Sequence, residues 1–197
     1  EVPSSPPFSY WDTIDFLFPA IQDEYHNYPK TIIQPVLEWN YEGSGEWTIA
    51  SWTVNKWSED PYDQESYRSK PHFVAKGNTI MGTIDASSEG WDITIENLNT
   101  SEYTAMRGQL EGIDSLWIFV ALEGYDIQDD SNVPGDTVFH DIMVRDGYGN
   151  DITESYILWY DMYGLEANNT LSDLKVRRYS DPYDYCPPRT IILETAN

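Results

Sequence analysis

The chain has 197 residues, of which 40% are hydrophobic and 15% are aromatic. This composition excludes an intrinsically disordered chain, and the length is that of one ordinary domain with a sizeable core. The formal net charge is −23, from 34 acidic and 11 basic residues. Because such a field repels nucleic acid and anionic membranes, we expect neither as a partner. A strongly acidic composition also favours function at acid pH, because many carboxylates are protonated there and the repulsion among negative charges is smaller.

Cysteine usage and glycosylation motifs bear on the cellular location. The single cysteine, Cys186, cannot form an intrachain disulfide, which fits a reducing compartment or a secreted β protein large enough to fold without one. Sequons begin at Asn99 and Asn168, and each is a glycan acceptor in a secretory pathway. No apolar run reaches the roughly 18 residues that a membrane span needs. We expect a secreted, glycosylated protein.

The first thirty residues differ in composition from the rest of the chain. Residues 1–30 are rich in proline and aromatic residues, which favours an extended backbone whose rings need cover. We interpret them as an N-terminal arm packed along the body, with a mobile, ligand-presenting tail as the alternative. Residues 31–197 are then a single domain.

The body opens with two segments that alternate between apolar and polar residues. Segments 32–39 and 46–54 flank a glycine-containing turn, and this arrangement predicts a β-hairpin. Pro35 near the middle of the first segment indicates an edge strand or a bulge. The period of two places four side chains of this segment on one side: Ile32, Gln34, Val36 and Glu38.

Further short strands are expected along the rest of the chain, with residues 55–69 as a loop. Segment 116–123 is apolar throughout, as expected for a central strand covered on both faces. No segment has a helical period, and many short strands separated by Gly and Asx turns indicate a β-sandwich or barrel. The other predicted strands are 71–74, 79–85, 91–96, 103–108, 138–144, 156–160 and 190–193.

Few residues suggest metal or nucleophilic chemistry. The three histidines are too scattered for a ligand set or a serine triad. One acidic loop offers clustered oxygens for calcium, but its spacing is irregular, and a solvated acidic loop is the better interpretation. We expect no metal and no cofactor. The residues concerned are His26, His72 and His140, and in the loop Asp126, Asp129, Asp130 and Asp136.

Carboxylates remain as candidates, because paired acids can hydrolyse a substrate without metal or histidine when only one holds a proton. The strand 91–96 ends at Glu96, just before a polar turn. A glutamate at this position is well placed to face a groove. The alternative is a solvated residue on the wet face of the strand.

Two short segments resemble the glutamic peptidases, or eqolisins. Residues 93–100 are similar to the Leu-Glu-Asn-Leu-Thr-Thr signature of that family, and residues 76–80 to the Gly-Asp-x-Ile turn that precedes it. Segments 117–125 and 136–144 follow the pattern of its later core strands, so the resemblance covers roughly residues 31–145.

The resemblance implies a two-sheet antiparallel β-sandwich of the concanavalin-like jelly-roll kind, with a catalytic Glu–Gln pair in a concave groove. Glu96 matches the glutamate that activates water as general base. The position of the glutamine falls in Leu37-Glu38-Trp39, so the chain carries Glu38 there instead. Gln34 lies on the same side of the strand and is a candidate to supply the amide.

Two consequences of the replacement are open. Glu38 and Glu96, sharing one proton, would form an acid-acting endopeptidase site. Alternatively, the protein has lost peptidase activity and binds a ligand instead.

The main rival is a carbohydrate-binding, lectin-like sandwich in which Trp39 and Trp52 supply stacking platforms. These tryptophans are equally well explained as core and cross-strand pairs. A third reading is an acid/base enzyme that acts on a small molecule in the same groove, again through Glu38 and Glu96. The expected partner is therefore a polypeptide, a glycan or a small molecule.

Overall fold

The computed structural model describes residues 1–7, 13–23, 30–58, 64–110, 116–128, 130–153, 175–178 and 190–194. Strands dominate these segments, with two short 3₁₀ turns at Tyr41–Gly43 and Asp130–Asn132. The strands are β1 (Ile14–Asp23), β2 (Lys30–Trp39), β3 (Trp47–Lys56), β4 (Gln64–Arg68), β5 (His72–Phe73), β6 (Ile80–Ser87), β7 (Gly90–Asn97), β8 (Glu102–Gly108), β9 (Leu116–Tyr125), β10 (Thr137–Phe139), β11 (Lys175–Arg178) and β12 (Ile191–Glu194).

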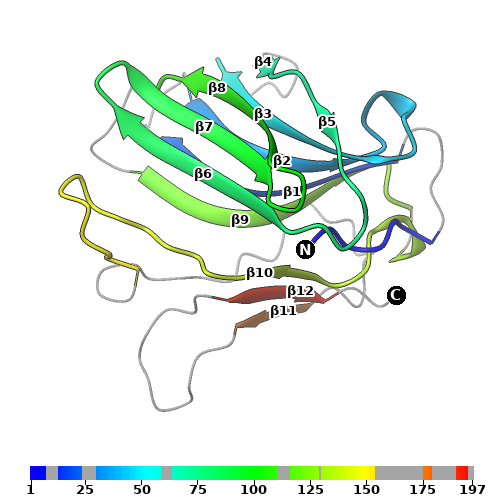
Figure 1. The fold of residues 1–197 in the computed structure, drawn as a ribbon. Coiled ribbons are helices and arrows are strands. Elements are labelled where there is room, and N and C mark those ends of the chain that lie inside the picture. Colours follow the sequence, from blue (N-terminus) through cyan, green and yellow to red (C-terminus); the bar gives the residue numbers. More distant parts are fainter. Residues whose placement is uncertain are drawn as a thin grey trace.

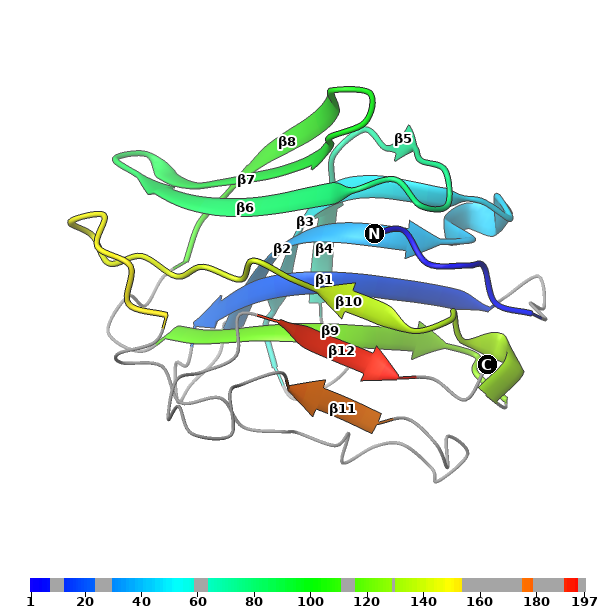
Figure 2. The same cartoon turned by 60° about the horizontal axis from the view of Figure 1, so that its bottom comes forward.

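The strands form an antiparallel β-sandwich, which confirms the predicted fold class. One layer is a six-stranded sheet in the order β4-β3-β2-β1-β9, with β5 also paired to β3. The opposing layer consists of two three-stranded sheets, β6-β7-β8 and β10-β12-β11. Figure 1 shows β6-β7-β8 at the top of the molecule and β10-β12-β11 at the bottom, and Figure 2 shows them as two separate sheets as well. None of the helices in the described segments is long and apolar enough to cross a membrane.

One apolar cluster joins the three sheets. Leu17 and Leu37 of the large sheet pack with Ile95 of β7 and Ile191 of β12 in a single buried cluster. Burial of side chains of this size contributes about 2 kcal/mol each. We call the side of the large sheet that carries Leu17 and Leu37 its inner face, and the opposite side its outer face.

The predicted division at residue 30 is wrong. β1 lies inside the large sheet, hydrogen-bonded to β2 on one side and to β9 on the other, so it belongs to the body. The arm is confined to the first residues. There Val2 is buried in the core, donates its N–H to the Asn78 carbonyl at 2.8 Å and accepts from Gly77 at 2.9 Å.

The other strand predictions succeed in part. The β2–β3 hairpin is confirmed, with Trp39 opposite Trp47, but β4 falls in the predicted loop. β9 is not a central strand: it pairs only with β1 among the described strands, and Trp117 is 46% exposed. Of the predicted strand 138–144, only Val138 and Phe139 are in a strand, as the end of β10. The predicted strand 156–160 lies outside the described residues.

Two prolines interrupt the middle of the large sheet. Pro35 lies in an interior strand rather than at an edge, paired with Ser51 of β3. Pro19 comes opposite it in β1, where the ladder is broken between Leu17–Leu37 and Ile21–Ile33. The break is expected because a proline has no N–H to donate. The proline rings lie beneath Gly82 of β6, where an added Cβ would be 2.7 Å from Pro35 Cγ.

Gly82→Ala tests this contact between the layers. We expect a loss of about 1–3 kcal/mol in the free energy of unfolding, because the new methyl group meets rigid rings. Urea denaturation measures the loss. Gly147→Ala is the matched control, because an added Cβ there has no neighbour within 4 Å. Equal midpoints for the two variants would contradict the close approach.

Candidate functional site

The outer face of the large sheet carries two of the predicted site residues. In β2, Leu37 and Ile33 pack with Ile95 and Ile93 of β7, respectively. Since successive side chains of a strand alternate, Gln34 and Glu38 project from the other face. The predicted pairing of these two residues on one side is therefore confirmed.

The Glu38 carboxylate is completely enclosed by donors. Its Oε1 accepts from Trp52 Nε1 at 2.5 Å and from Arg68 Nε at 3.0 Å, and its Oε2 accepts from Thr48 Oγ1 at 2.7 Å and from Arg68 Nη2 at 2.5 Å. Arg68 thus binds both oxygens in the bidentate geometry typical of strong ion pairs. The Glu38 side chain is 0% exposed and that of Arg68 is 15% exposed.

Aromatic rings surround this ion pair. The Arg68 guanidinium lies 4.3 Å from the centre of the Tyr41 ring, which adds a cation–π contact. Tyr41 meets Trp52 edge-on at 5.3 Å, and Phe16 of β1 meets Trp52 at 5.9 Å. Trp52 is therefore a core residue, held in place by its ring contacts and by its bond to Glu38.

Gln34 is the polar side chain on this face that remains available. It lies opposite Trp52 in the β2–β3 register, is 7% exposed, and its side chain forms no hydrogen bond with a described residue. A primary amide in such a position has both donors and an acceptor to offer an incoming main chain.

Glu96 lies on the other side of the molecule. Ile93, Ile95 and Asn97 of β7 are buried, so Glu96 points away from the large sheet, between Met81 of β6 and Tyr103 of β8. Glu38 points away from β7 in the opposite direction. Sheets in a sandwich pack about 10 Å apart, so the two carboxyl groups project from opposite sides of two layers. The predicted Glu38–Glu96 pair, with one shared proton, is not formed.

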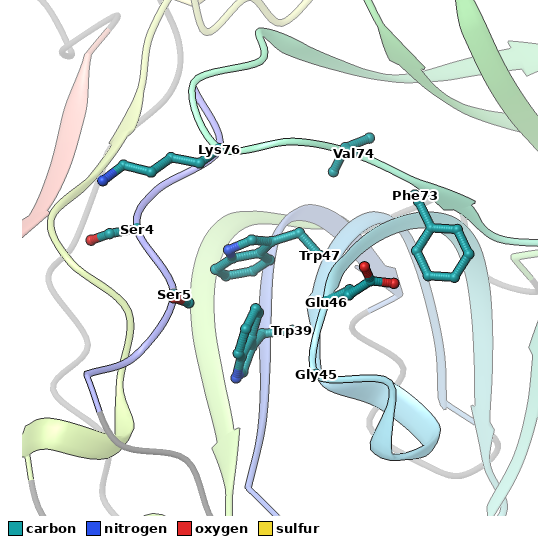
Figure 3. Close-up of a pocket in the computed structure, with 9 residues that line it drawn as sticks. All are labelled: Ser4, Ser5, Trp39, Gly45, Glu46, Trp47, Phe73, Val74 and Lys76. Carbon is teal, nitrogen blue, oxygen red and sulfur yellow. The ribbon is translucent and has the colours of Figure 1, made fainter.

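Trp39 belongs to a third location, on the inner face. Its indole ring lies 5.4 Å from that of its cross-strand neighbour Trp47, and both rings line a cavity of about 280 Å³. Figure 3 shows this cavity, with Ser4 and Ser5 of the N-terminal segment across from the tryptophans. The structure thus separates Trp39 from Trp52, which were predicted to act in one groove.

Asp15 is a buried acid next to this end of the sheet. It lies opposite Trp39 in the β1–β2 register, is 0% exposed, and neither carboxylate oxygen has a hydrogen-bond partner. Burial raises the pKa of Asp15 from 3.8 to about 7, because an apolar environment disfavours the charged form.

Sequence reasoning missed two of these groups. Arg68 lies in the strand Gln64–Arg68, whose sequence has no apolar period and therefore predicts a loop. Asp15 interrupts the apolar run of β1, which is the signal of a buried acid. The prolines around this run obscure that signal, because they favour an extended arm.

Of the candidate metal ligands and modification sites, only some lie in the described segments. Within the described segments no group of three or more His, Cys, Asp and Glu side chains is arranged to hold a metal ion. Asp129 of the acidic loop, Cys186 and the Asn168 sequon lie outside those segments, as does His26. Asn99 is exposed, and its side-chain oxygen accepts from the Thr79 N–H at 2.7 Å.

The geometry defines an antiparallel β-sandwich with a buried ion pair on one outer face and a tryptophan-lined cavity at one end. No family model and no curated protein matches the chain. A search of solved structures finds the Scytalido-glutamic peptidase in complex with a peptide-based transition state analogue. The chain is 14% identical to it, with a TM-score of 0.55, and the match covers 99% of this chain and 95% of that chain. The fold of this chain is therefore similar to that of this glutamic peptidase.

Glu38→Gln tests whether Glu38 is a structural ion-pair member. All of its N–H partners can only donate, so an amide NH₂ at this place would face another donor and leave the guanidinium unpaired. We expect the free energy of unfolding to fall by about 3 kcal/mol. The same change at the partly exposed Glu96 is the control and should cost less than about 0.5 kcal/mol. If Glu38→Gln were as stable as the wild type in urea denaturation, a role as a proton-holding carboxyl would be restored.

Asp15→Asn tests the buried acid through the pH dependence of stability. Because the folded-state pKa is raised, the folded protein holds the Asp15 proton between about pH 4 and about pH 7 while the unfolded chain has lost it. Over that window the wild type loses up to about 4 kcal/mol of stability as the pH rises. The uncharged asparagine should remove this loss. Thermal or urea unfolding from acid to neutral pH measures the difference between the two proteins. Asp85→Asn at an exposed position should track the wild type, and parallel curves for all three proteins would contradict the assignment.

Proposed function

We propose that this protein, with its peptidase-like fold, binds an extended polypeptide across the outer face of the large sheet. Gln34 forms hydrogen bonds with the bound polypeptide. The observation that carries the proposal is the full-length match to a glutamic-peptidase fold whose solved structure holds a peptide-based analogue. The position of Gln34 supports it, because an amide beside Trp52 offers both a donor and an acceptor to a peptide unit.

The residues around Gln34 give the contact a fixed frame. The Glu38–Arg68 ion pair holds Trp52 through its indole N–H, and Trp52 in turn packs on Phe16 and Tyr41. Each ring therefore has a fixed orientation before a ligand arrives. Pre-ordering of this kind lowers the entropic cost of binding.

Hydrolysis through Glu38 and Glu96 is not part of the proposal. Glu38 is bound on both oxygens by donors, and Glu96 faces the other side of the sandwich. The same separation removes the acid/base enzyme for small molecules that would have used these two groups. We propose binding as the function and keep cleavage as an outcome of the test.

The test is calorimetric titration with one extended peptide made in cationic, neutral and anionic versions. We expect the cationic version to bind most tightly, because the chain carries a net charge of −23. Gln34→Leu keeps the size of the side chain and removes the amide, so affinity should fall by about three- to tenfold. Gln64→Leu on the exposed edge strand β4 is the matched control and should change nothing.

Cleavage is measured in the same samples by incubating the protein with a denatured protein at acid pH. We expect the wild type and Glu96→Gln to give identical results. Acid-dependent cleavage that disappears in Glu96→Gln would contradict the proposal and support catalysis by Glu38 and Glu96. Failure of every peptide to bind would also overturn it.

We further propose that the protein acts outside the cell at acid pH. The supporting observations are the acidic composition, the exposed Asn99 sequon and Asp15, whose burial favours the folded state in acid. Expression in a secretory host should give a species whose mass falls after glycosidase treatment, and Asn99→Gln should reduce that shift.

A further inference from the structure

The outer face of the large sheet has a second glutamate in line with Glu38. In the strand register, Phe16 of β1 lies opposite Glu38 of β2 on one side and opposite Glu123 of β9 on the other. Figure 2 shows β1 between these two strands. Because directly opposite residues of antiparallel strands project from the same face, the three side chains form one row. We call the Glu38 side of this row its buried end and the Glu123 side its exposed end.

Aromatic rings extend from Phe16 to both ends of the row. At the buried end, the centre of the Phe16 ring lies 5.9 Å from that of Tyr41 and 5.9 Å from that of Trp52. At the exposed end, it lies 5.8 Å from the centre of the Tyr125 ring. The Tyr125 hydroxyl donates to Glu123 Oε1 at 2.8 Å. Each end of the row therefore combines a carboxylate with an aromatic ring.

The buried end shows which group such an arrangement holds. Arg68 of β4 lies there, bound bidentately by Glu38 and with its guanidinium 4.3 Å from the centre of the Tyr41 ring. A guanidinium suits this place because its planar fork matches a carboxylate and its flat side stacks on an aromatic ring. The chain thus fills the buried end with an arginine of its own.

The exposed end has the same components but no cation from the described residues. Glu123 is exposed, and among those residues its carboxylate interacts only with Tyr125. Since a carboxylate has about four acceptor positions, Glu123 keeps enough of them for a bidentate partner. Tyr125 is 47% exposed, so part of its ring is open to a ligand.

These components select the charge of the ligand. An anion would be repelled by Glu123 and by the net charge of −23. A neutral group would gain hydrogen bonds but not the attraction between a cation and an aromatic ring. Among cations, a guanidinium is favoured over an ammonium group, because it can use both oxygens of Glu123 while it stacks on Tyr125.

We infer that the exposed end of the row is a subsite for an arginine side chain of the bound polypeptide. The inference rests on the proposed function and narrows its ligand to an extended polypeptide that carries arginine. Glu123 accepts hydrogen bonds from the guanidinium, whose flat side packs on the Tyr125 ring. Arg68 and the incoming arginine then lie on either side of Phe16.

The positions of Gln34 and Glu123 set the length of polypeptide that reaches both. Gln34 precedes Glu38 by four residues in β2, and β9 lies two strands away from β2. From the usual rise per residue and strand spacing, Gln34 and Glu123 are roughly 16 Å apart. An extended chain covers this distance in about five residues. The polypeptide therefore needs about that many residues on one side of its arginine.

The test is calorimetric titration with an uncharged peptide that contains one central arginine and about six residues on each side. A second peptide has citrulline, the uncharged isostere of arginine, at the centre, and a third has lysine. Salt at about 0.15 M screens the general field of the protein beyond about 8 Å. We expect the arginine peptide to bind about tenfold more tightly than the citrulline peptide, with the lysine peptide between them.

Glu123→Gln removes the charge of the subsite. Affinity for the arginine peptide should fall about fivefold, and affinity for the citrulline peptide should stay the same. Glu102→Gln is the matched control, because Glu102 is also an exposed strand glutamate that accepts one hydroxyl bond, from Thr100, but it lies in β8. Both variants change the net charge equally, so an effect of Glu123→Gln alone assigns the arginine to the subsite.

The outcomes distinguish this inference from the proposed function. Equal affinities for the arginine and citrulline peptides would overturn the inference and leave the polypeptide face in place. An arginine preference that survives Glu123→Gln would do the same. Failure of every peptide to bind would overturn both. A preference that depends on Glu123 but not on Gln34 would support the subsite and contradict the proposed Gln34 contact.

Discussion

The bond network of Glu38 is the constraint on which the outer face of the large sheet depends. One carboxylate from β2 joins Thr48 and Trp52 of β3 to Arg68 of β4. The Glu38 carboxylate is completely buried, and the four hydrogen bonds that it accepts offset the free-energy cost of its desolvation. The same bonds fix the Trp52 ring and, through it, the surroundings of Gln34.

Enclosure of this kind changes the chemistry of the carboxylate. An acid that is to share a proton with a second acid needs that acid within reach and a free lone pair on the same side. Glu38 has neither, because its partners are N–H and O–H donors and Glu96 projects from the opposite layer. Glu38 is best explained as a structural residue, whose carboxylate ties β2 to β3 and β4 through Trp52, Thr48 and Arg68.

The inner face at the hairpin end has the opposite property, because polar groups there are buried without partners. Asp15, Trp39 and Trp47 lie in one row across β1, β2 and β3, and their side-chain polar atoms are unpaired. Native structures leave few such groups. The desolvated Asp15 makes the fold more stable in acid, and the indole N–H groups of Trp39 and Trp47 are likewise enclosed without a hydrogen-bond partner.

The sequence by itself determined the architecture and much of the local order. Alternation in 32–39 and 46–54 was sufficient for the hairpin and for the common side of Gln34 and Glu38, because the period of a strand is a local property. It failed where the local pattern was mixed. The proline-rich sequence of β1 predicts an arm, and the polar sequence of β4 predicts a loop. Only the tertiary structure decided which face of each strand meets the other layer. That choice separates Glu38 from Glu96, because two strands with identical alternation can present their polar sides to opposite exteriors once their apolar sides pack together.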